Sequence, residues 1–93
     1  MYQGHIGDGN FHCILLYNSQ LDGAEGLLKI QRFNDRLVKR ALDMEGTCTG
    51  EHGIGYGKKS WLEIEHGPGA VSLMRQLKRA VDPNNIMNPG KVV

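Results

Sequence analysis

The chain has 93 residues, of which 40% are hydrophobic and 23% charged, and its formal net charge is +1 at pH 7. This composition is typical of a globular protein, and the near-neutral charge excludes a broad electrostatic attraction to nucleic acid or acidic membranes. The longest apolar run, residues 13–17, is far shorter than the roughly 20 residues that span a bilayer. We therefore expect no nucleic-acid partner and no membrane span, and the first residues show no targeting segment.

The first part of the chain is predicted to be a glycine-rich loop followed by a buried strand. The loop covers residues 4–10, and residues 11–17 are apolar on both faces, as expected of a central strand. On one straight strand His5 and His12 would point to opposite faces, because side chains alternate. The two imidazoles can converge only if Gly7 and Gly9 bend the chain between them.

The rest of the chain is predicted to be mainly helical. Apolar residues at three- and four-residue spacings predict a helix over residues 24–45, which Gly46 ends. Residues 46–50 are expected to form a short strand, residues 58–65 a short helix, and Pro68 starts a further helix that runs to Val81. Residues 82–85 end it, and residues 86–91 form an ordered turn. The positions expected to face the core are Leu27, Ile30, Leu37, Ala41 and Met44 in the long helix, and Val71, Met74, Leu77 and Val81 in the last.

Two imidazoles and a carboxylate lie among glycines and suggest a metal site. His5, His12 and Glu51 are candidate ligands, because neutral imidazole and carboxylate hold catalytic divalent metals. The alternative is that His12 is a hydrogen-bonded strand residue and Glu51 a surface carboxylate. Asp8 either orients one imidazole or stabilises the turn near Gly9.

His52 directly follows Glu51 and is a candidate general base, because imidazole titrates near neutral pH. A third metal ligand or a hydrogen-bonding loop residue are the alternatives. The glycine-rich run from Gly53 to Ser60 is not a phosphate-binding loop, because His52 occupies the position of a required glycine and Lys59 that of the serine or threonine. Another anion-binding role for Lys58, on a carboxylate, stays open. The two cysteines form no CxxC pair; reduced thiols are the simpler expectation, and a disulfide between them stays open.

The chain resembles the C-terminal cap region of FAD-linked oxidases of the vanillyl-alcohol oxidase type, closest to the branch of D-lactate dehydrogenase and the glycolate oxidase flavin subunit. Three motifs carry this resemblance and cover the chain almost end to end, in the right order. They are His5-x-Gly-Asp-Gly-Asn-x-His12, Gly50-Glu-His-Gly-Ile-Gly55 followed by Lys58, and Asp82-Pro-x-Asn-Ile-Met-Asn-Pro-Gly-Lys91.

The resemblance implies an α+β fold: residues 1–93 would be the C-terminal fragment of a ferredoxin-like antiparallel-sheet cap domain with covering helices. The family's FAD-binding domain lies upstream and outside this chain. Few strand-like segments are present here, which agrees with a part of something larger. We therefore expect the fragment to be inactive alone.

The resemblance also implies roles for individual residues. His5, His12 and Glu51 would bind zinc or manganese, His52 would be the catalytic base, and the flavin would lie near Asn88, Pro89 and Gly90. Asn10 and Lys58 are candidate substrate-binding residues. The implied reaction is the metal-assisted, FAD-dependent oxidation of a small D-2-hydroxy acid, similar to D-lactate, to the 2-oxo acid. The metal would polarise the substrate, His52 would remove the hydroxyl proton, and the hydride would pass to the flavin.

Ile14 is apolar where dicarboxylate-oxidising relatives look to have asparagine, which favours monocarboxylic substrates. The expected location is mitochondrial in a eukaryote, and cytoplasmic or membrane-peripheral in a bacterium; the sequence does not give the electron acceptor. Two other functions stay open. One is a small metal-binding module or metal-dependent hydrolase without flavin, and the other is a structural or regulatory fragment that docks on a larger partner.

Overall fold

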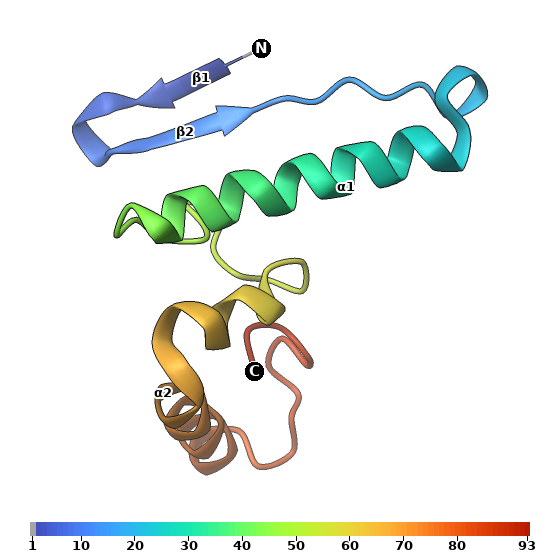
Figure 1. Ribbon diagram of the computed structural model, residues 1–93. Coiled ribbons are helices and arrows are strands. Elements are labelled where there is room, and N and C mark those ends of the chain that lie inside the picture. Colours follow the sequence, from blue (N-terminus) through green and yellow to red (C-terminus); the bar gives the residue numbers. More distant parts are fainter. Residues whose placement is uncertain (1) are drawn as a thin grey trace. The chain divides into compact units, whose positions relative to one another are not determined.

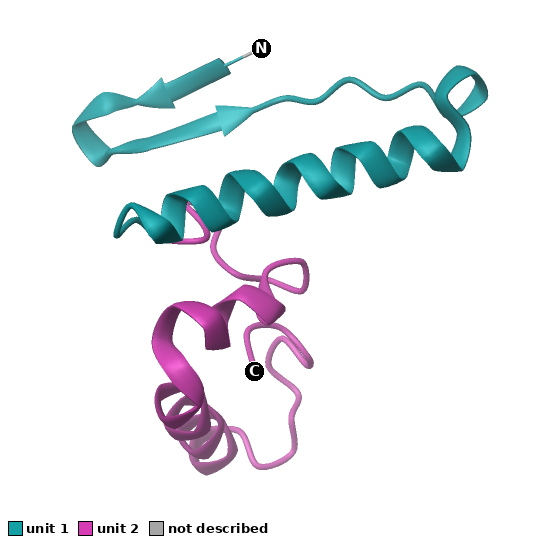
Figure 2. Cartoon of the chain, in the orientation of Figure 1, with its two compact units in different colours: residues 1–46 teal, residues 47–93 magenta. Residues whose placement is uncertain are grey.

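The computed structural model describes residues 2–93 and contains few elements. They are β1 (Tyr2–His5), the 3₁₀ helix η1 (Ile6–Asp8), β2 (Asn10–Cys13), α1 (Ser19–Asp43) and α2 (Lys59–Val81) (Figure 1). Two antiparallel strands with two long helices confirm the predicted α+β class. No helix within residues 2–93 combines the length and the apolar character that crossing a membrane requires. The chain divides into two compact units, unit 1 (residues 1–46) and unit 2 (residues 47–93), and we describe each by itself (Figure 2).

In unit 1, β1 and β2 form an antiparallel hairpin in which Tyr2 pairs with Cys13 and His5 with Asn10. The predicted loop is therefore shorter than expected, because both of its ends belong to strands. The strand predicted over residues 11–17 ends at Cys13, and the prediction that it is central and buried is wrong: Phe11 is 55% exposed. Among the described residues β2 has one neighbouring strand, β1, so no second strand extends its ladder through residues 14–17.

The long helix α1 begins with a capped turn and a break. The Asn18 side chain accepts hydrogen bonds from the backbone N–H groups of Gln20 and Leu21 (3.0 and 3.3 Å), which satisfies two donors of the first turn. Gly23 then leaves helical geometry at φ 56° and ψ −159°. The continuous helix therefore starts at Ala24, as the sequence predicted, with one extra turn before it.

The end of α1 is a Schellman motif. Glu45 is the left-handed residue, at φ 61°, and its N–H donates to Leu42 O (3.0 Å). The N–H of Gly46 donates to Ala41 O (2.8 Å), and a Cβ on Gly46 would lie 2.9 Å from that oxygen. Gly46 thus ends the helix as predicted, but because the backbone approaches closely and not because φ is positive.

The predicted apolar stripe of α1 is only partly covered. Val38 is buried, whereas Leu27 and Met44 are exposed, so the prediction that both face a core is wrong. The spacing of these residues is helical, but a stripe is buried only where another element covers it. Among the described elements, no strand or helix makes extensive contacts with α1.

The short strand predicted over residues 46–50 does not form in unit 2 or at its border. Gly46 completes the end of α1, and the Cys48 N–H donates to the Glu65 carboxylate (2.8 Å) instead of to a neighbouring strand. The backbone donor that a strand would need is therefore used by a side chain of α2.

Helix α2 contains a kink at Gly67, which has φ 79° and ψ 163° and directly precedes Pro68. The two predicted helices, before and after this point, are therefore confirmed. Leu62 and Val71 are buried on α2, but Leu77 and Val81 are exposed, so the predicted inner face ends early. Unit 2 also buries Cys48 and the carboxylate of Asp82, at 4% and 6% exposure.

Candidate functional site

The hairpin of unit 1 places two imidazoles on one face. Gln3 pairs with His12, and His5 pairs with Asn10. Directly paired residues lie on the same face of a hairpin, and so do residues two positions apart on one strand. His5 and His12 are consequently diagonal neighbours, with ring centroids 6.3 Å apart and an interplanar angle of 86°. The bend that the sequence required to bring these imidazoles together is present.

Glycine makes this bend and the close strand approach beside it. Gly9 has a left-handed φ of 67°, and its N–H donates to Ile6 O (3.2 Å) to close the connection. Gly4 is needed for a different reason, because a Cβ at this position would lie 2.6 Å from Asn10 O. No atom lies within 4 Å of a Cβ built on Gly7. Of the two glycines expected to bend the chain, Gly9 adopts the conformation that a side chain would strain.

Asn10 lies on the same face as the two imidazoles. Its Oδ1 atom is buried and has no hydrogen-bond partner within the described part of the chain. A buried polar atom without a partner costs free energy, so a bound cation or donor at this oxygen would stabilise the hairpin. Asp8 lies exposed in η1, as expected of a turn residue. Its proposed orientation of an imidazole stays a prediction.

The hairpin carries two side chains of the type that binds divalent metals. Two imidazoles that bind one tetrahedral zinc ion through nitrogen, at about 2.0–2.1 Å, have their ring centres about 5 Å apart. The His5 and His12 rings, 6.3 Å apart, would have to approach by about 1 Å to share an ion in this geometry. Imidazole nitrogen combined with a carboxylate oxygen suits zinc and manganese. The hairpin therefore supplies two donors of the required type, and the Glu51 carboxylate is the further donor that the sequence offers.

Glu51 and His52 occupy a hydrogen-bonded turn of unit 2. The Gly53 N–H donates to Gly50 O (3.1 Å), and the Thr49 hydroxyl donates to Gly53 O (2.8 Å). Because this segment is a turn and not a strand, the adjoining side chains stay close: Glu51 Oε1 lies 3.7 Å from His52 Nε2. The His52 side chain is 77% exposed, which leaves the imidazole accessible to a substrate.

Lys58 lies directly before α2. Its N–H donates to Ile54 O (3.2 Å) and its carbonyl accepts from Trp61 N–H (3.0 Å), so the backbone here is part of the turn that starts α2. The side chain is half-buried. Its binding of a substrate carboxylate stays a prediction.

The C-terminal segment forms the ordered turn that the sequence predicted. Asn88 and Gly90 are both left-handed, with φ 48° and φ 75°, and the Lys91 N–H donates to Asn88 O (3.2 Å). The carbonyl of Pro89 accepts from the Tyr56 hydroxyl, and that of Gly90 accepts from the Lys59 ammonium, each at 2.9 Å. The proposed flavin-contacting residues therefore lie in a defined turn held by side chains from before and within α2.

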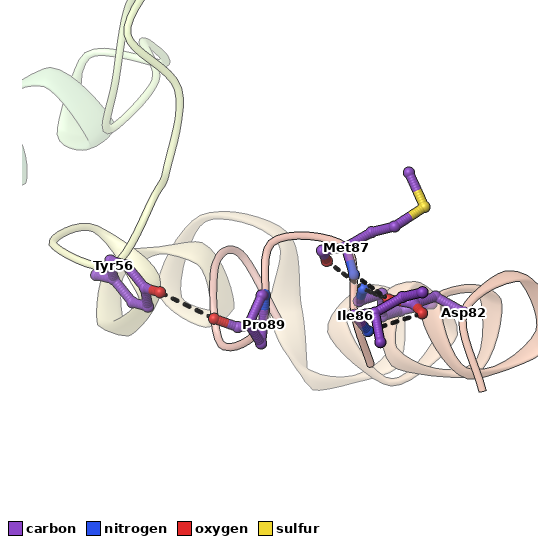
Figure 3. A network of polar contacts seen from close by, with 6 residues as sticks. Tyr56, Asp82, Ile86, Met87 and Pro89 are labelled. Atoms are coloured by element: carbon purple, nitrogen blue, oxygen red, sulfur yellow. Dashed lines mark hydrogen bonds and ion pairs between the residues drawn. The ribbon is translucent and has the colours of Figure 1, made fainter. Parts of the chain in front are cut away.

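Asp82 holds the other end of this segment, as Figure 3 shows. Its two carboxylate oxygens accept hydrogen bonds from the N–H groups of Ile86 and Met87, both at 3.0 Å, and it pairs with the Lys78 ammonium. The bond from Lys78, together with the bonds from the backbone, holds the pKa of Asp82 below its usual value. A buried aspartate thus fixes the chain where it leaves α2.

Cys48 is a buried free thiol beside the carboxylate of Glu65. Burial, and then hydrogen bonding to Glu65, raises the pKa of Cys48 to about 11. Burial alone would raise the pKa of Glu65, but the hydrogen bonds donated by Cys48 and Thr47 lower it overall. The second cysteine, Cys13, is also free. Cys48 is therefore a structural residue and an unreactive thiol.

The sequence analysis assigned no role to Tyr56 or Lys59, and it predicted that Asp82 ends the last helix but not that its carboxylate holds the following segment. Asp82 carried a signal, because an aspartate at a helix end followed by proline often binds nearby backbone N–H groups. Tyr56 and Lys59 carried none, since their acceptors lie 33 and 31 residues further along the chain.

The comparison with known protein families gives a match along almost the whole chain. The matching family is described as FAD linked oxidases, C-terminal domain, and the match covers residues 1–92. The chain belongs to this family. This agrees with the resemblance seen in the three sequence motifs.

Individual relatives of this FAD-linked oxidase chain have names from the same branch. It is 50% identical to a probable mitochondrial D-lactate dehydrogenase of Danio rerio, over 97% of this chain and 18% of the relative. It is 51% identical to a mitochondrial D-lactate dehydrogenase [cytochrome] of Saccharomyces cerevisiae, over 96% of this chain and 14% of the relative. It is 35% identical to the glycolate oxidase subunit GlcD of Bacillus subtilis, over 96% of this chain and 18% of the relative. The chain thus spans less than a fifth of the length of these relatives.

Proposed function

We propose that the protein containing this chain oxidises a small D-2-hydroxy acid, similar to D-lactate, to the 2-oxo acid with FAD as electron acceptor. The observation that carries this proposal is the His5–His12 pair, formed in a chain that matches FAD-linked oxidases over residues 1–92. The names of the relatives in zebrafish, yeast and Bacillus support the substrate class.

The chain covers only a small part of the relatives' length, so we propose that substrate binding and FAD binding belong largely to different domains. We assign residues 1–93 to the C-terminal part of the cap domain, which binds substrate and metal, and most of the FAD-binding surface to a domain outside this chain. Asn88, Pro89 and Gly90 are the proposed flavin contacts within the chain. Gly90 suits this role because it adds no side chain to a turn that a planar ring would approach.

The proposed mechanism assigns the chain's own residues to binding and proton transfer. His5, His12 and Glu51 would hold zinc or manganese, which when bound polarises the hydroxyl and carboxylate oxygens of the substrate. Lys58 pairs with the substrate carboxylate, and Asn10 offers its unpaired amide oxygen on the face that carries the two imidazoles.

His52 takes the hydroxyl proton in this mechanism. FAD, when bound, would supply the hydride-accepting chemistry, and the alcohol, losing one proton and one hydride, would become the ketone. The chain thereby provides orientation and a base, while the redox chemistry belongs to the cofactor.

Ile14 supports a preference for monocarboxylic acids. It lies two residues after His12, and its apolar side chain offers no hydrogen bond from which a second substrate carboxylate could gain affinity. We therefore expect D-lactate to be oxidised with a higher kcat/KM than D-2-hydroxyglutarate.

The family match favours this function over the metal-dependent hydrolase, because a hydrolase would need no flavin. Since the zebrafish and yeast relatives are named mitochondrial, we propose a mitochondrial location if the source is a eukaryote.

The experiment that tests the proposal is D-lactate-dependent reduction of an electron-accepting dye by the full-length protein. His52→Ala should lower turnover at least about 100-fold and leave the bound metal in place, because it removes only the base. His66→Ala is the matched control: its Nε2 lies 3.6 Å from the carboxylate of the preceding Glu65, a similar arrangement with no proposed role. Retained turnover in His52→Ala would remove His52 from the mechanism, and a wild-type protein that reduces the dye without bound flavin would contradict the proposed function.

A further inference from the structure

The loop that follows His52 and the C-terminal segment are joined by hydrogen bonds. Val92 N–H donates to Gly55 O, and the Tyr56 hydroxyl donates to Pro89 O, both at 2.9 Å. Figure 3 shows the phenol of Tyr56 directed at the Pro89 carbonyl. Segments separated by more than thirty residues are therefore fastened together within unit 2.

Tyr56 and Lys59 supply the side chains of this connection, and the Lys59 ammonium donates to Gly90 O (2.9 Å). Besides the bond to Pro89, the Tyr56 ring lies 5.7 Å from the Lys91 ammonium, and a Cβ built on Gly90 would be 3.3 Å from its Cε1 atom. Tyr56 thus bonds to Pro89 and lies beside the next two residues. It is nevertheless 63% exposed, so burial of apolar surface does not account for its position.

The turn from Asn88 to Gly90 is consequently fixed at both ends. Asp82 holds the segment just before it, through the N–H groups of Ile86 and Met87. Tyr56 and Lys59 hold the turn itself, through Pro89 O and Gly90 O. Asp82 belongs to the end of α2, but Tyr56 belongs to the loop that begins at His52, four residues earlier.

That loop is short and closed on itself. Gly53 and Gly55 are left-handed, and Lys58 N–H returns to Ile54 O (3.2 Å). A displacement of Tyr56 therefore cannot be absorbed over a long flexible stretch and reaches the residues on either side. The bond from the Tyr56 phenol is thus one of those that join the loop of the proposed base to the proposed flavin-contacting turn.

We propose that Tyr56 is a positioning residue that sets the Asn88–Gly90 turn relative to the His52 loop, and through it the binding of FAD. This inference rests on the proposed function, because the flavin contact of the turn is part of that function. The hydroxyl supplies the hydrogen bond, and the ring keeps Gly90 and Lys91 in place.

The test compares Tyr56→Phe with Tyr17→Phe in the full-length protein. Both variants lose one hydroxyl that donates to a backbone carbonyl; that of Tyr17 bonds to Gly23 O at 2.8 Å within unit 1. One neutral hydrogen bond is worth about 0.5–1.5 kcal/mol, which corresponds to about 2- to 12-fold in an equilibrium constant. We expect Tyr56→Phe to raise the dissociation constant of FAD by this factor, while kcat at saturating FAD changes less.

Tyr17→Phe should leave FAD binding within about twofold of the wild type, because the bond that it removes lies within unit 1 and none of the bonds that hold the turn is changed. Tyr56→Leu, which also removes the ring, should weaken FAD binding more than Tyr56→Phe. Equal weakening by Tyr17→Phe and Tyr56→Phe would reduce Tyr56 to a general contribution to stability. Unchanged FAD binding in both Tyr56 variants would likewise overturn the inference.

Hydrogen exchange of the Val92 amide separates this inference from the proposed function, because it needs no flavin. Faster exchange in Tyr56→Phe but not in Tyr17→Phe supports the connection between the loop and the turn; unchanged exchange contradicts it. If the wild-type protein binds no FAD, the proposed function and the flavin part of this inference both fail, while the Val92 amide still reports on the connection.

Discussion

The two units of this chain hold their proposed functional residues in different ways. In unit 1 the hairpin positions His5 and His12 through backbone pairing and through the small size of Gly4. In unit 2 the C-terminal turn is positioned by side chains, with Asp82 and Tyr56 bonded to backbone groups. A site of the first kind is sensitive to added volume, whereas one of the second kind is sensitive to lost hydrogen-bonding groups.

The largest expected effect is the loss of the metal that we propose to be bound by His5, His12 and Glu51. His12→Ala should abolish stoichiometric metal in the purified full-length protein, because a metal site seldom tolerates the loss of one of three protein ligands. Gln3→Ala is the control, since Gln3 pairs with His12 on the same face and has no proposed role. Elemental analysis measures both variants. An unchanged metal content in His12→Ala would remove this residue from the site.

A smaller effect tests whether volume is what matters in the hairpin. Gly4→Ala would place a Cβ 2.6 Å from Asn10 O, so β1 and β2 must separate, at a cost of about 1–3 kcal/mol in the free energy of unfolding. Gly7→Ala is the matched control, because no atom lies within 4 Å of its Cβ and its φ is not left-handed. Urea unfolding of the full-length variants measures the difference. Equal stability of the two would show that the close approach at Gly4 is not a constraint.

The smallest effect concerns the side-chain bonds of unit 2 and depends on pH. Because Asp82 has a lowered pKa, its stabilisation of the turn is complete above its unfolded-state pKa, about 3.9, and is lost as the pH falls through the lower, folded-state value. Protection of the Ile86 and Met87 amides from hydrogen exchange should therefore fall below about pH 4. In Asp82→Asn this pH-dependent loss should be absent.

Glu65 provides the internal control for that measurement. Its pKa is also lowered and it accepts from the Cys48 amide, so protection of Cys48 should decline at acidic pH in the wild type and in Asp82→Asn alike. A loss of protection at Ile86 that persists in Asp82→Asn would mean that another group controls the turn.

Local patterns were sufficient to predict the helices and their breaks. Pro68, the glycine before it and the apolar spacing of residues 24–45 act over one or two turns, and the structure confirms the elements they predict. The sequence also predicted that the chain must bend between His5 and His12 for the two imidazoles to converge, because side chains alternate along a strand.

Features that depend on distant residues could not be predicted. The apolar run after Cys13 reads as a buried strand, but a strand is central only if neighbours pair on both sides, and these are not encoded in the run itself. The strand predicted over residues 46–50 does not form, because the Cys48 N–H bonds to the carboxylate of Glu65. Glu65 lies 17 residues further along the chain, and no local pattern indicates this bond. The partners of Tyr56 and Lys59 were missed for the same reason.

The open sides of the hairpin have a practical consequence for protein chemistry. Within residues 2–93 each of the two strands pairs only with the other, and strands of this kind readily add a further strand from another molecule. Several exposed aromatic and aliphatic side chains of the hairpin and the following segment, among them Tyr2, Phe11 and Leu16, would favour such self-association. A preparation of this polypeptide alone should therefore be kept dilute and checked by light scattering before any spectroscopic or crystallisation work.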